Sequence, residues 1–361
     1  MICKNEATTI ARAIGSVRPW LTAFELGDTG SADQTIEIAS TLLAGLKGNI
    51  TIDAWRDFSH NRNLVMERAR QYCLPILFLD CDDELVPLSD DSDANNWDIL
   101  TVWAYDGSIR HRRILALNPD FKARWQGSIH EELVWPDLPT PKMHHTAVFA
   151  VKYHHDGARN TSGNATTMHD LQVLRTNIAG GRQTERSQYY LARTLHQGEM
   201  LDEAMLEYEK YLQMRGGDDD TAFHSLWSLA AIFEAVGREK HVVLEKLEQA
   251  HRVRPQRVEP LVTAARIHRE AGDPESAFEY CLRALSAVGL VSEGKIRAQI
   301  PDDDFVDISY YGWRLYDELA TNALLTGKKD LGREALCLAL ASPYLPSHAR
   351  TRISLNNLHL G

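Results

Sequence analysis

Long apolar runs are missing from this 361-residue chain. No stretch approaches the ~18 apolar residues that a membrane-spanning helix needs. The first residues, Met-Ile-Cys, lead directly into Lys4-Asn5-Glu6, which predicts no secretory signal. Low-complexity tracts are missing too, and 44% hydrophobic with 25% charged residues is typical of an ordinary globular protein. These absences argue against membrane-spanning and secreted classes, and the length allows two domains.

Cysteine is scarce and shows no pattern. The chain has five cysteines, an odd number, and no two of them form a C-x-x-C pair. Such a set argues against a disulfide framework and against a zinc site. We therefore expect a reducing, cytoplasmic setting, in which the glycosylation sequences at Asn160 and Asn164 are chance matches.

Excess positive charge is also missing. The net charge is −11, and both halves of the chain share it. This argues against a global basic field that would attract nucleic acid. One local cluster differs, and it comprises Arg110, His111, Arg112, Arg113, Lys122 and Arg124. It is either a solvated strand face or a site that faces phosphate or a polyanion.

Strand and helix signals alternate over the first 80 residues. Apolar residues at helical spacing predict helices near 10–17, 36–46 and 61–72. Short apolar runs predict strands at 23–26, 50–52 and 75–79. Strands that alternate with helices imply a parallel sheet, and ligands bind at the carboxyl ends of its strands. The polar residues at such ends are Asn5 and Glu6, Asp28, and Asp80 and Asp82.

The pattern changes twice after this region. Strand signals at 98–105, 112–117 and 147–153 predict a β-rich second half of a mixed α/β domain. The polar stretch 158–167 predicts a linker. From about residue 168 onward the strand signals disappear, which predicts an all-α region.

Small residues recur in this second region at a repeat spacing. The same offset separates the pairs Ala192/Ala204, Ala265/Ala277 and Ala323/Ala335. Ala231 marks a middle copy, about 34 residues before Ala265, which is the period of tetratricopeptide repeats. An insertion that includes Gly294–Asp304 precedes the last copy. The region therefore resembles a degenerate tetratricopeptide array, and a generic helical bundle is the alternative.

An acidic turn follows the strand at 75–79. Asp80-Cys-Asp82 offers hard oxygen ligands, which suit Mg²⁺ or Mn²⁺, and such a metal in turn binds a nucleotide diphosphate. Alternate residues point to opposite sides of an extended chain, so we expect Asp82 to be the direct ligand. A solvated acidic turn is the alternative.

Several short motifs occur in a fixed order. They are Lys4-Asn5-Glu6, Asp28–Asp33, Asp57–Asn63, Leu79–Glu84, Gly127–Glu131 and Val151–Gly157. Together they resemble the GT-A domain of family 2 glycosyltransferases, in the branch that carries C-terminal tetratricopeptide repeats. The resemblance implies an α/β GT-A domain with a Rossmann-like mixed sheet at 1–157, a linker at 158–167, and an all-α repeat domain at 168–361. It also implies a metal-dependent, inverting hexosyltransferase that uses UDP-glucose or a similar UDP-sugar.

The same resemblance implies roles on the donor side. Asp28 would recognise the uracil base, and Asn5 and Glu6 would line the base and ribose pocket. Arg62 would lie near the diphosphate, while Asp80 and Asp82 would hold the metal and the ribose. The alternatives are that Asp28 caps a helix and that Arg62 forms a plain surface salt bridge.

Roles on the acceptor side follow from the later motifs. His155 is the candidate for a further ligand of Mn²⁺ or Mg²⁺, and His154 competes with it; either histidine is otherwise structural. Glu131 is the candidate general base, and His130 would orient it or contact the diphosphate. Glu131 is otherwise a sugar-binding or structural residue.

The acceptor stays open at this point. A peptide or protein, an envelope glycan and a modified DNA base are all compatible, and the acidic charge makes DNA the least favoured. The repeats would hold the acceptor or form a homodimer. One rival interpretation is a scaffold whose degenerate transferase domain and repeats bind a protein partner. A nucleotidyltransferase is a second rival, although the chain lacks its glycine-rich phosphate loop.

Overall fold

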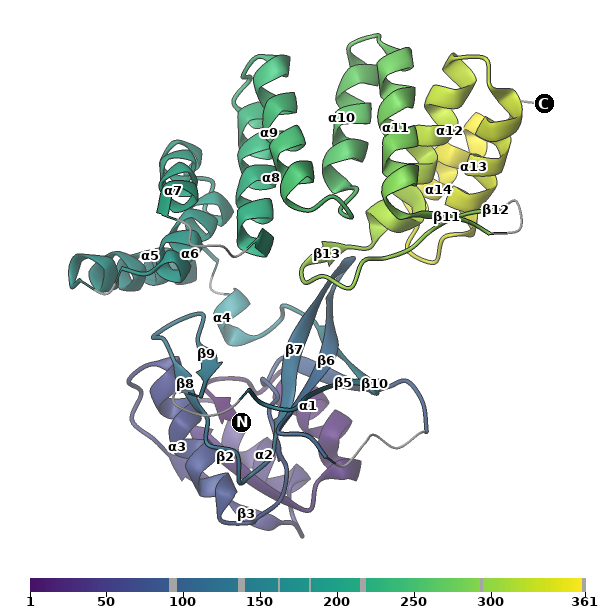
Figure 1. Cartoon of the computed structure of the whole chain (residues 1–361). Helices are drawn as coiled ribbons and strands as arrows, with labels where there is room; N and C mark the ends of the chain where they lie inside the picture. Colours follow the sequence, from purple (N-terminus) through teal and green to yellow (C-terminus); the bar gives the residue numbers. More distant parts are fainter. Residues whose placement is uncertain are drawn as a thin grey trace. The chain divides into compact units, whose positions relative to one another are not determined.

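The computed structural model describes residues 1–90, 96–135, 140–161, 163–181, 183–214, 219–292 and 295–358. The chain divides into two compact units, which are coloured along the sequence in Figure 1. The first unit comprises Met1–Gly107 and His111–Gln183, and the second comprises Ser108–Arg110 and Thr184–Gly361. Among the described helices, none is both long and apolar enough to cross a membrane.

A small parallel sheet opens the first unit. Its strands are β1 (Ile2–Cys3), β2 (Ala23–Asp28) and β3 (Lys47–Ile52), with β2 in the middle. Cys3 pairs with Asp28, and Asp28 with Ile52, so the three carboxyl ends coincide. The predicted parallel pairing is confirmed for β2 and β3. It is wrong for the strand predicted at 75–79, because Ile76–Leu77 pairs antiparallel in another sheet.

Three helices pack beside this sheet, namely α1 (Ile10–Val17), α2 (Thr35–Leu42) and α3 (Phe58–Arg70). Helix α1 buries Ile10, Ile14 and Val17 on one face, because positions three and four apart share a side of a helix. Helix α3 begins where the Asp57 carboxylate accepts a 2.7 Å hydrogen bond from the His60 amide. The Asp57–Asn63 motif is thus in part a helix start.

A mixed sheet forms the rest of the first unit. Its members here are β4 (Ile76–Leu77), β5 (Asp83–Pro87), β6 (Ile99–Asp106), β7 (Ile109–Leu117) and β10 (Met143–Tyr153). Strands β6 and β10 are parallel, whereas the β10–β5 and β4–β7 pairs are antiparallel. A separate two-stranded ribbon joins β8 (Arg124–Gln126) to β9 (Glu132–Val134). The mixed sheet confirms the α/β class at this coarse level.

Helices occupy the stretch for which a linker was predicted. Helix α4 spans Ala158–Thr161 and α5 spans Asn164–Ala179, both within the first unit. The first turn of α4 lies against the motif residues, since the Glu6 carboxylate accepts hydrogen bonds from the Ala158 amide at 3.2 Å.

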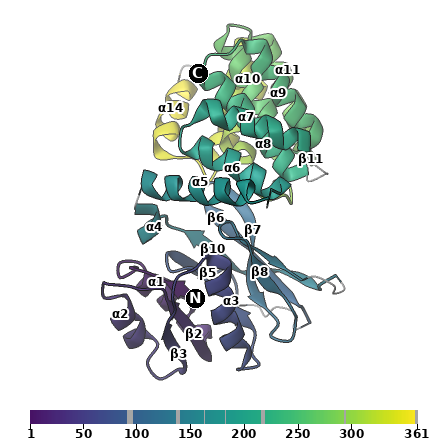
Figure 2. The same cartoon turned by 90° about the vertical axis from the view of Figure 1, so that its left-hand side faces the viewer.

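Antiparallel helix pairs make up the second unit (Figures 1 and 2). The helices are α6 (Glu185–Gln197), α7 (Leu201–Met214), α8 (Asp219–Ala235), α9 (Lys240–Val253), α10 (Glu259–Glu270), α11 (Pro274–Val288), α12 (Leu315–Leu325), α13 (Lys329–Ala341) and α14 (Ser347–Leu358). Each pair from α6/α7 to α12/α13 is one hairpin. The predicted array of repeated helical hairpins is confirmed.

Buried alanines let the helices of each hairpin approach closely. The fully buried ones include Ala192, Ala204, Ala265, Ala277, Ala323 and Ala335. In the middle hairpin the buried residue is Ala230, whereas Ala231 is exposed. The predicted register was therefore wrong by one residue there, and one residue turns a helix face by about 100°.

The insertion before the last hairpin contains strands, which the expectation of an all-α region missed. Strands β11 (Gly289–Ser292) and β12 (Lys295–Ala298) form a hairpin. Strand β13 (Val306–Asp307) pairs with Ile109 and Arg110. A π-helical turn at Tyr310–Arg314, η2, then leads into α12. Period-2 patterns need several residues, so strands this short leave no clear signal.

Candidate functional site

The first predicted site lies where β1 and β2 end. The Asp28 carboxylate accepts hydrogen bonds from the amides of Gly30 (3.0 Å) and Ser31 (2.9 Å). Asn5 closes the same loop, because its side-chain oxygen accepts from the Ala32 amide at 2.8 Å. Asp28 therefore stabilises its own loop and does not cap α2, as one alternative held. These motif residues meet as a network that holds two strand ends together.

Arg62, Asp80 and Glu131 come together from three distant parts of the sequence. Arg62 donates to Glu131 at 2.6 Å and to Asp80 at 2.7 Å. Arg113 donates to the other Asp80 oxygen at 2.8 Å and also pairs with Asp83. The Arg62 side chain is only 15% exposed, so this is not the plain surface salt bridge that we considered.

The arginines decide how these carboxylates ionise. Burial alone would raise the pKa of Asp80, but the charges of Arg62 and Arg113 outweigh it and hold that pKa below its usual range. Burial raises the pKa of Asp83 to about 6, although Arg113 opposes the shift. Asp80 is thus a carboxylate that two guanidinium groups already neutralise.

Asp82 belongs to a different set of contacts. Its carboxylate accepts a 3.1 Å hydrogen bond from the Asn160 amide group, and its backbone carbonyl accepts from Arg12 at 2.9 Å. Among the described residues, no group of three or more His, Cys, Asp or Glu side chains could hold a metal ion. Arginines already occupy both oxygens of Asp80, so Asp80 does not fit a cation in this arrangement. The Mn²⁺ or Mg²⁺ site stays a prediction.

The three candidate histidines lie in separate surroundings. His155 contacts Asp106 at 2.7 Å, and His154 contacts Glu84 at 2.8 Å. His130 adopts a left-handed backbone conformation, with φ of 50°, directly before Glu131. Each of the first two thus pairs with a carboxylate outside the Asp80–Asp82 turn. The role of His155 or His154 as a metal ligand stays a prediction.

The basic cluster at 110–124 does not act as one group. Arg113 is buried in the ion pairs described above, and Arg112 lies 5.1 Å over the ring of Trp103. His111 stacks on Tyr153, with ring centroids 5.5 Å apart. Alternation along β7 sends successive side chains to opposite faces. The three side chains therefore do not form one solvated strand face, because each of them contacts a different partner.

A second polar site lies in the helical unit, where the insertion runs along several helices. Phe305 lies 5.4 Å from the Arg193 guanidinium, and its ring centroid is 5.8 Å from that of His224. Tyr310 contacts Trp227, with centroids 5.9 Å apart, and the Thr263 hydroxyl. We call Arg193, His224, Trp227 and Thr263 the first-helix face, because α6, α8 and α10 are each the first helix of a hairpin.

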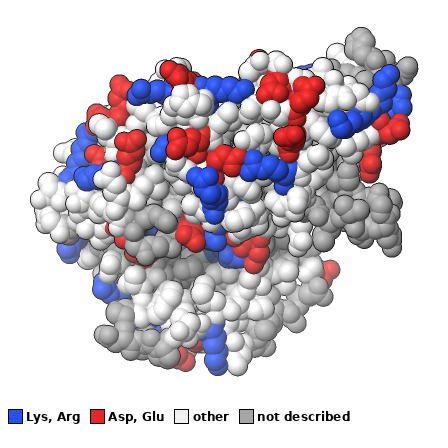
Figure 3. Space-filling model, turned by 45° about the horizontal axis from the view of Figure 1, so that its top comes forward, with Lys and Arg blue, Asp and Glu red and all other residues white. Residues whose placement is uncertain are grey.

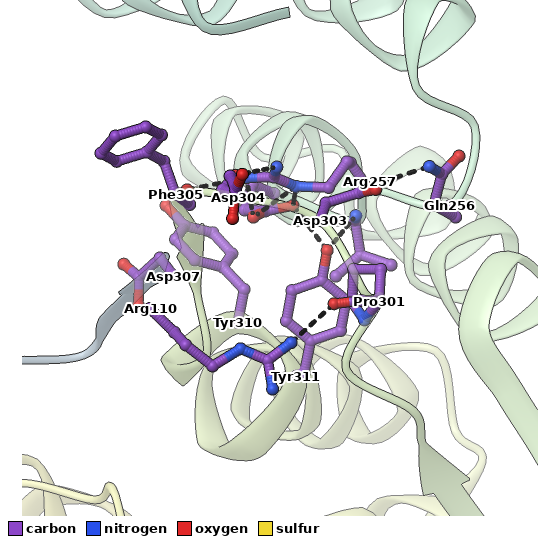
Figure 4. A network of polar contacts seen from close by, with 12 residues as sticks. Arg110, Gln256, Arg257, Pro301, Asp303, Asp304, Phe305, Asp307, Tyr310 and Tyr311 are labelled. Atoms are coloured by element: carbon purple, nitrogen blue, oxygen red, sulfur yellow. Dashed lines mark hydrogen bonds and ion pairs between the residues drawn. The ribbon is translucent and has the colours of Figure 1, made fainter. Parts of the chain in front are cut away.

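Arg257 fixes the insertion to this unit (Figure 4). Arg257 and Glu259 are both 0% exposed, and their side chains pair at 2.7 Å. The remaining Arg257 donors reach the backbone carbonyls of Asp304 (3.2 Å) and Phe305 (3.0 Å). Tyr311 donates to Glu259 at 2.8 Å. Together, the buried charge pair and these hydrogen bonds fix the backbone of the insertion at Asp304 and Phe305.

His224 lies deep in this cluster. Burial lowers its pKa to about 3, and the nearby positive charges of Arg257, Arg193 and Arg254 add to the shift. His224 is therefore a neutral imidazole at physiological pH, next to Phe305.

Elsewhere on the helical unit, charges alternate in sign. Figure 3 shows Lys and Arg interspersed with Asp and Glu over the face that it draws. Ion pairs link successive hairpins, as between Arg266 and Glu234 (2.7 Å) and between Arg283 and Glu248 (2.6 Å). A groove of about 730 Å³ lies between α7, α8 and α9, and its lining includes Leu212, Lys246 and Arg252. Such mixed surfaces are typical of solvated helices.

The sequence analysis missed the first-helix face. Tyr311 is far along the chain from Val258 and Glu259, and its hydroxyl meets both residues only through the fold. One signal was available, namely that the insertion contains three aspartates followed directly by Phe305.

Comparison with known proteins gives a likeness to helical repeat proteins. No protein-family model matches the chain, and no curated protein matches it. Among solved structures, MamA shows 10% identity over 56% of this chain and 97% of its own, with a TM-score of 0.35. TTC0263, a tetratricopeptide repeat protein of Thermus thermophilus, shows 15% identity over 55% and 94%, with a TM-score of 0.36. YrrB, described as a tetratricopeptide repeat protein with an unusual peptide-binding site, shows 13% identity over 56% and 88%, with a TM-score of 0.37.

These findings correct the family assignment. The prediction of a family 2 glycosyltransferase, and with it that of an enzyme, is wrong, because the solved structures found are tetratricopeptide repeat proteins and no glycosyltransferase model matches. The motifs misled because they are short and rich in Asp, Asn and Gly. In this chain Asp28 and Asp57 close a turn and start a helix, and Asp80 is neutralised by arginines. Turn and cap chemistry favours those same residue types.

Proposed function

We propose that the helical unit is a scaffold that binds an extended segment of a partner protein on its first-helix face. One observation carries this proposal. The face already holds a segment of its own chain, Asp303–Phe305, whose Phe305 ring contacts Arg193 and His224. A surface that orders one loop segment of its own chain has the chemistry to order a segment of another protein.

The repeat architecture gives a physical reason for this role. Each hairpin contacts mainly its neighbours, so the first helices of successive hairpins present their side chains in series along one surface. Trp227 and Tyr310 supply flat apolar area, while Arg193 supplies charge. Rings and arginines of this kind carry most of the binding energy in protein interfaces.

The proposal assigns no role in binding to the cluster around Asp80. Its charges are matched internally by Arg62 and Arg113. A buried, matched cluster of this type fixes the conformation of a unit and offers little to a partner. A homodimer through the repeats, the other expected role of the array, is a separate outcome of the experiment below.

Peptide selection on the intact chain tests this function. A library of random peptides is displayed against the wild type, and the enriched peptides are then titrated against Arg193→Glu and Trp227→Ala variants. We expect each substitution to weaken binding by about tenfold or more, which corresponds to ~1.4 kcal/mol. The matched control is Arg333→Glu on α13, at an exposed position, and it should leave binding unchanged.

Circular dichroism confirms that each variant is folded. If no peptide is enriched, or if the enriched peptides bind Arg193→Glu and Arg333→Glu equally well, the first-helix face is not a binding surface. Light scattering across a range of concentrations separates the dimer. A mass that doubles only when Arg193 and Trp227 are intact would assign this face to a second copy of the chain.

A further inference from the structure

We propose that the partner segment is acidic with an aromatic residue at its end, and that Asp303–Phe305 is an internal occupant that it must displace. This inference rests on the proposed function and adds the class of partner and the regulation of the same face. It follows from what the insertion places on the first-helix face and how that segment is held.

Charge complementarity sets the class of partner. Asp302, Asp303 and Asp304 precede Phe305 in the insertion. In the part of the chain that the structure describes, Arg193 makes no ion pair with a carboxylate, and it lies 5.4 Å over the Phe305 ring. Arg257 donates to the Phe305 carbonyl, and its own charge is matched by Glu259, so Arg193 supplies the positive charge of this face. In a chain of net charge −11, a cationic and aromatic face of this kind selects acidic segments with a ring.

The contacts to the occupant fall into two kinds. Arg257 binds the carbonyls of Asp304 and Phe305, which any peptide would offer. Gln256 donates to the Asp303 carboxylate at 2.9 Å, and Arg193 contacts the Phe305 ring, so these two contacts depend on side chains (Figure 4 shows the first of them). Backbone contacts give affinity to any extended chain, and side-chain contacts give specificity.

The occupant is held in an unfavourable conformation. Phe305 has a φ of 54°, in the left-handed region that non-glycine residues seldom adopt. Such a conformation persists only where the surroundings impose it, and it is frequent in switch regions and ligand clamps. An external segment that reaches the same partners without this strain has an advantage over the internal one.

The face also continues beyond the occupant. On α6, Arg186 lies 4.8 Å over the ring of Tyr190, and Arg193 lies 6.0 Å over the same ring. These three residues follow one another at helical spacing, so they form a row that starts at Phe305. A partner segment longer than the internal one gains contacts along this row, which is how it competes with a tethered occupant.

A labelled copy of the insertion tests the inference. The probe is a fluorescein-labelled peptide with the sequence of residues 300–308, Ile-Pro-Asp-Asp-Asp-Phe-Val-Asp-Ile. Its affinity is measured by anisotropy for the wild-type chain and for an Asp303→Asn/Phe305→Ala variant. If the internal segment occupies the face about 90% of the time, the variant should bind the peptide about tenfold more tightly than the wild type.

Two controls define the class of partner. A peptide with asparagine in place of all four aspartates and alanine in place of phenylalanine should bind at least about tenfold more weakly. Adding Arg193→Glu to the variant should remove the tight binding, whereas adding Arg333→Glu should not. Equal affinity of the wild type and the variant would overturn the displacement, and equal affinity for the neutral peptide would overturn the acidic class.

Hydrogen exchange on the wild type gives a readout that needs no folded variant. A saturating peptide should speed amide exchange at residues 303–307, because the occupant leaves the face. Unchanged exchange there, with the peptide bound, would refute the inference. Selected peptides that require Arg193 but carry no acidic residues would also refute this inference, while leaving the proposed function intact. If no peptide binds in a way that depends on the first-helix face, both the inference and the proposed function are refuted.

Discussion

Replacing Arg257 by alanine should destabilise the helical unit by about 3–5 kcal/mol, because breaking a buried ion pair leaves one charge without a partner. Arg257 and Glu259 are both 0% exposed and pair at 2.7 Å. The substitution also removes the donors to the carbonyls of Asp304 and Phe305. The Tyr311 hydroxyl would remain as a neutral donor to Glu259, which does not offset a full charge.

Urea unfolding of the full chain, followed by circular dichroism, measures this loss. The control is Arg333→Ala, whose partner Asp330 lies 3.4 Å away with both side chains at least half exposed, and it should cost less than about 1 kcal/mol. A double variant, Arg257→Met/Glu259→Met, should be more stable than Arg257→Ala because no buried charge is left unpaired. If Arg257→Ala costs no more than the control, the buried pair drawn in Figure 4 does not hold the insertion.

Two further perturbations test packing and ionisation. Gly15→Ala should stabilise α1 by about 0.5–1 kcal/mol, since Gly15 lies in a helix with open space around it. Gly332→Ala should destabilise α13, because the new methyl would lie 2.7 Å from Leu324. Thermal unfolding compares the two variants, and a stabilised Gly332→Ala would contradict the close helix contact. His224 keeps a folded pKa of about 3, below its usual 6.5, so the unfolded state takes up a proton first as the pH falls. The free energy of unfolding should therefore fall from about pH 6.5 toward pH 3 by up to ~1.4 kcal/mol per pH unit. His224→Gln should remove this component from the pH profile of urea unfolding. Identical profiles for the wild type and the variant would refute the buried neutral imidazole.

Local patterns in the sequence predicted much of the secondary structure. Ile10, Ile14 and Val17 mark α1, and the alanine pairs such as Ala265 and Ala277 mark the hairpins. These predictions succeed because residues three and four apart share one face of a helix, so burial leaves a trace in nearby sequence. The register error at Ala231 shows the limit of such a trace, since a neighbouring small residue fits the pattern equally well.

The function inferred from motifs failed for a reason that the same logic explains. An acidic turn has the same sequence whether its carboxylate oxygens bind a cation or an arginine side chain. Arg113 lies far from Asp80 in the sequence, and the residues near Asp80 do not predict that this guanidinium will contact it. The family resemblance supplied roles that the local sequence did not itself require.

The sequence by itself determined most of the helices, the parallel pairing of β2 with β3 and the repeat spacing, because these depend on backbone preferences and on residues close along the chain. Only the tertiary structure decided which charges neutralise one another and where the insertion lies. Arg62 and Arg113 meet Asp80, and Arg257 meets Phe305, through long-range contacts whose free energy depends on burial and geometry. Those contacts leave the Asp80 turn neutralised within its own unit and place Phe305 on the first-helix face.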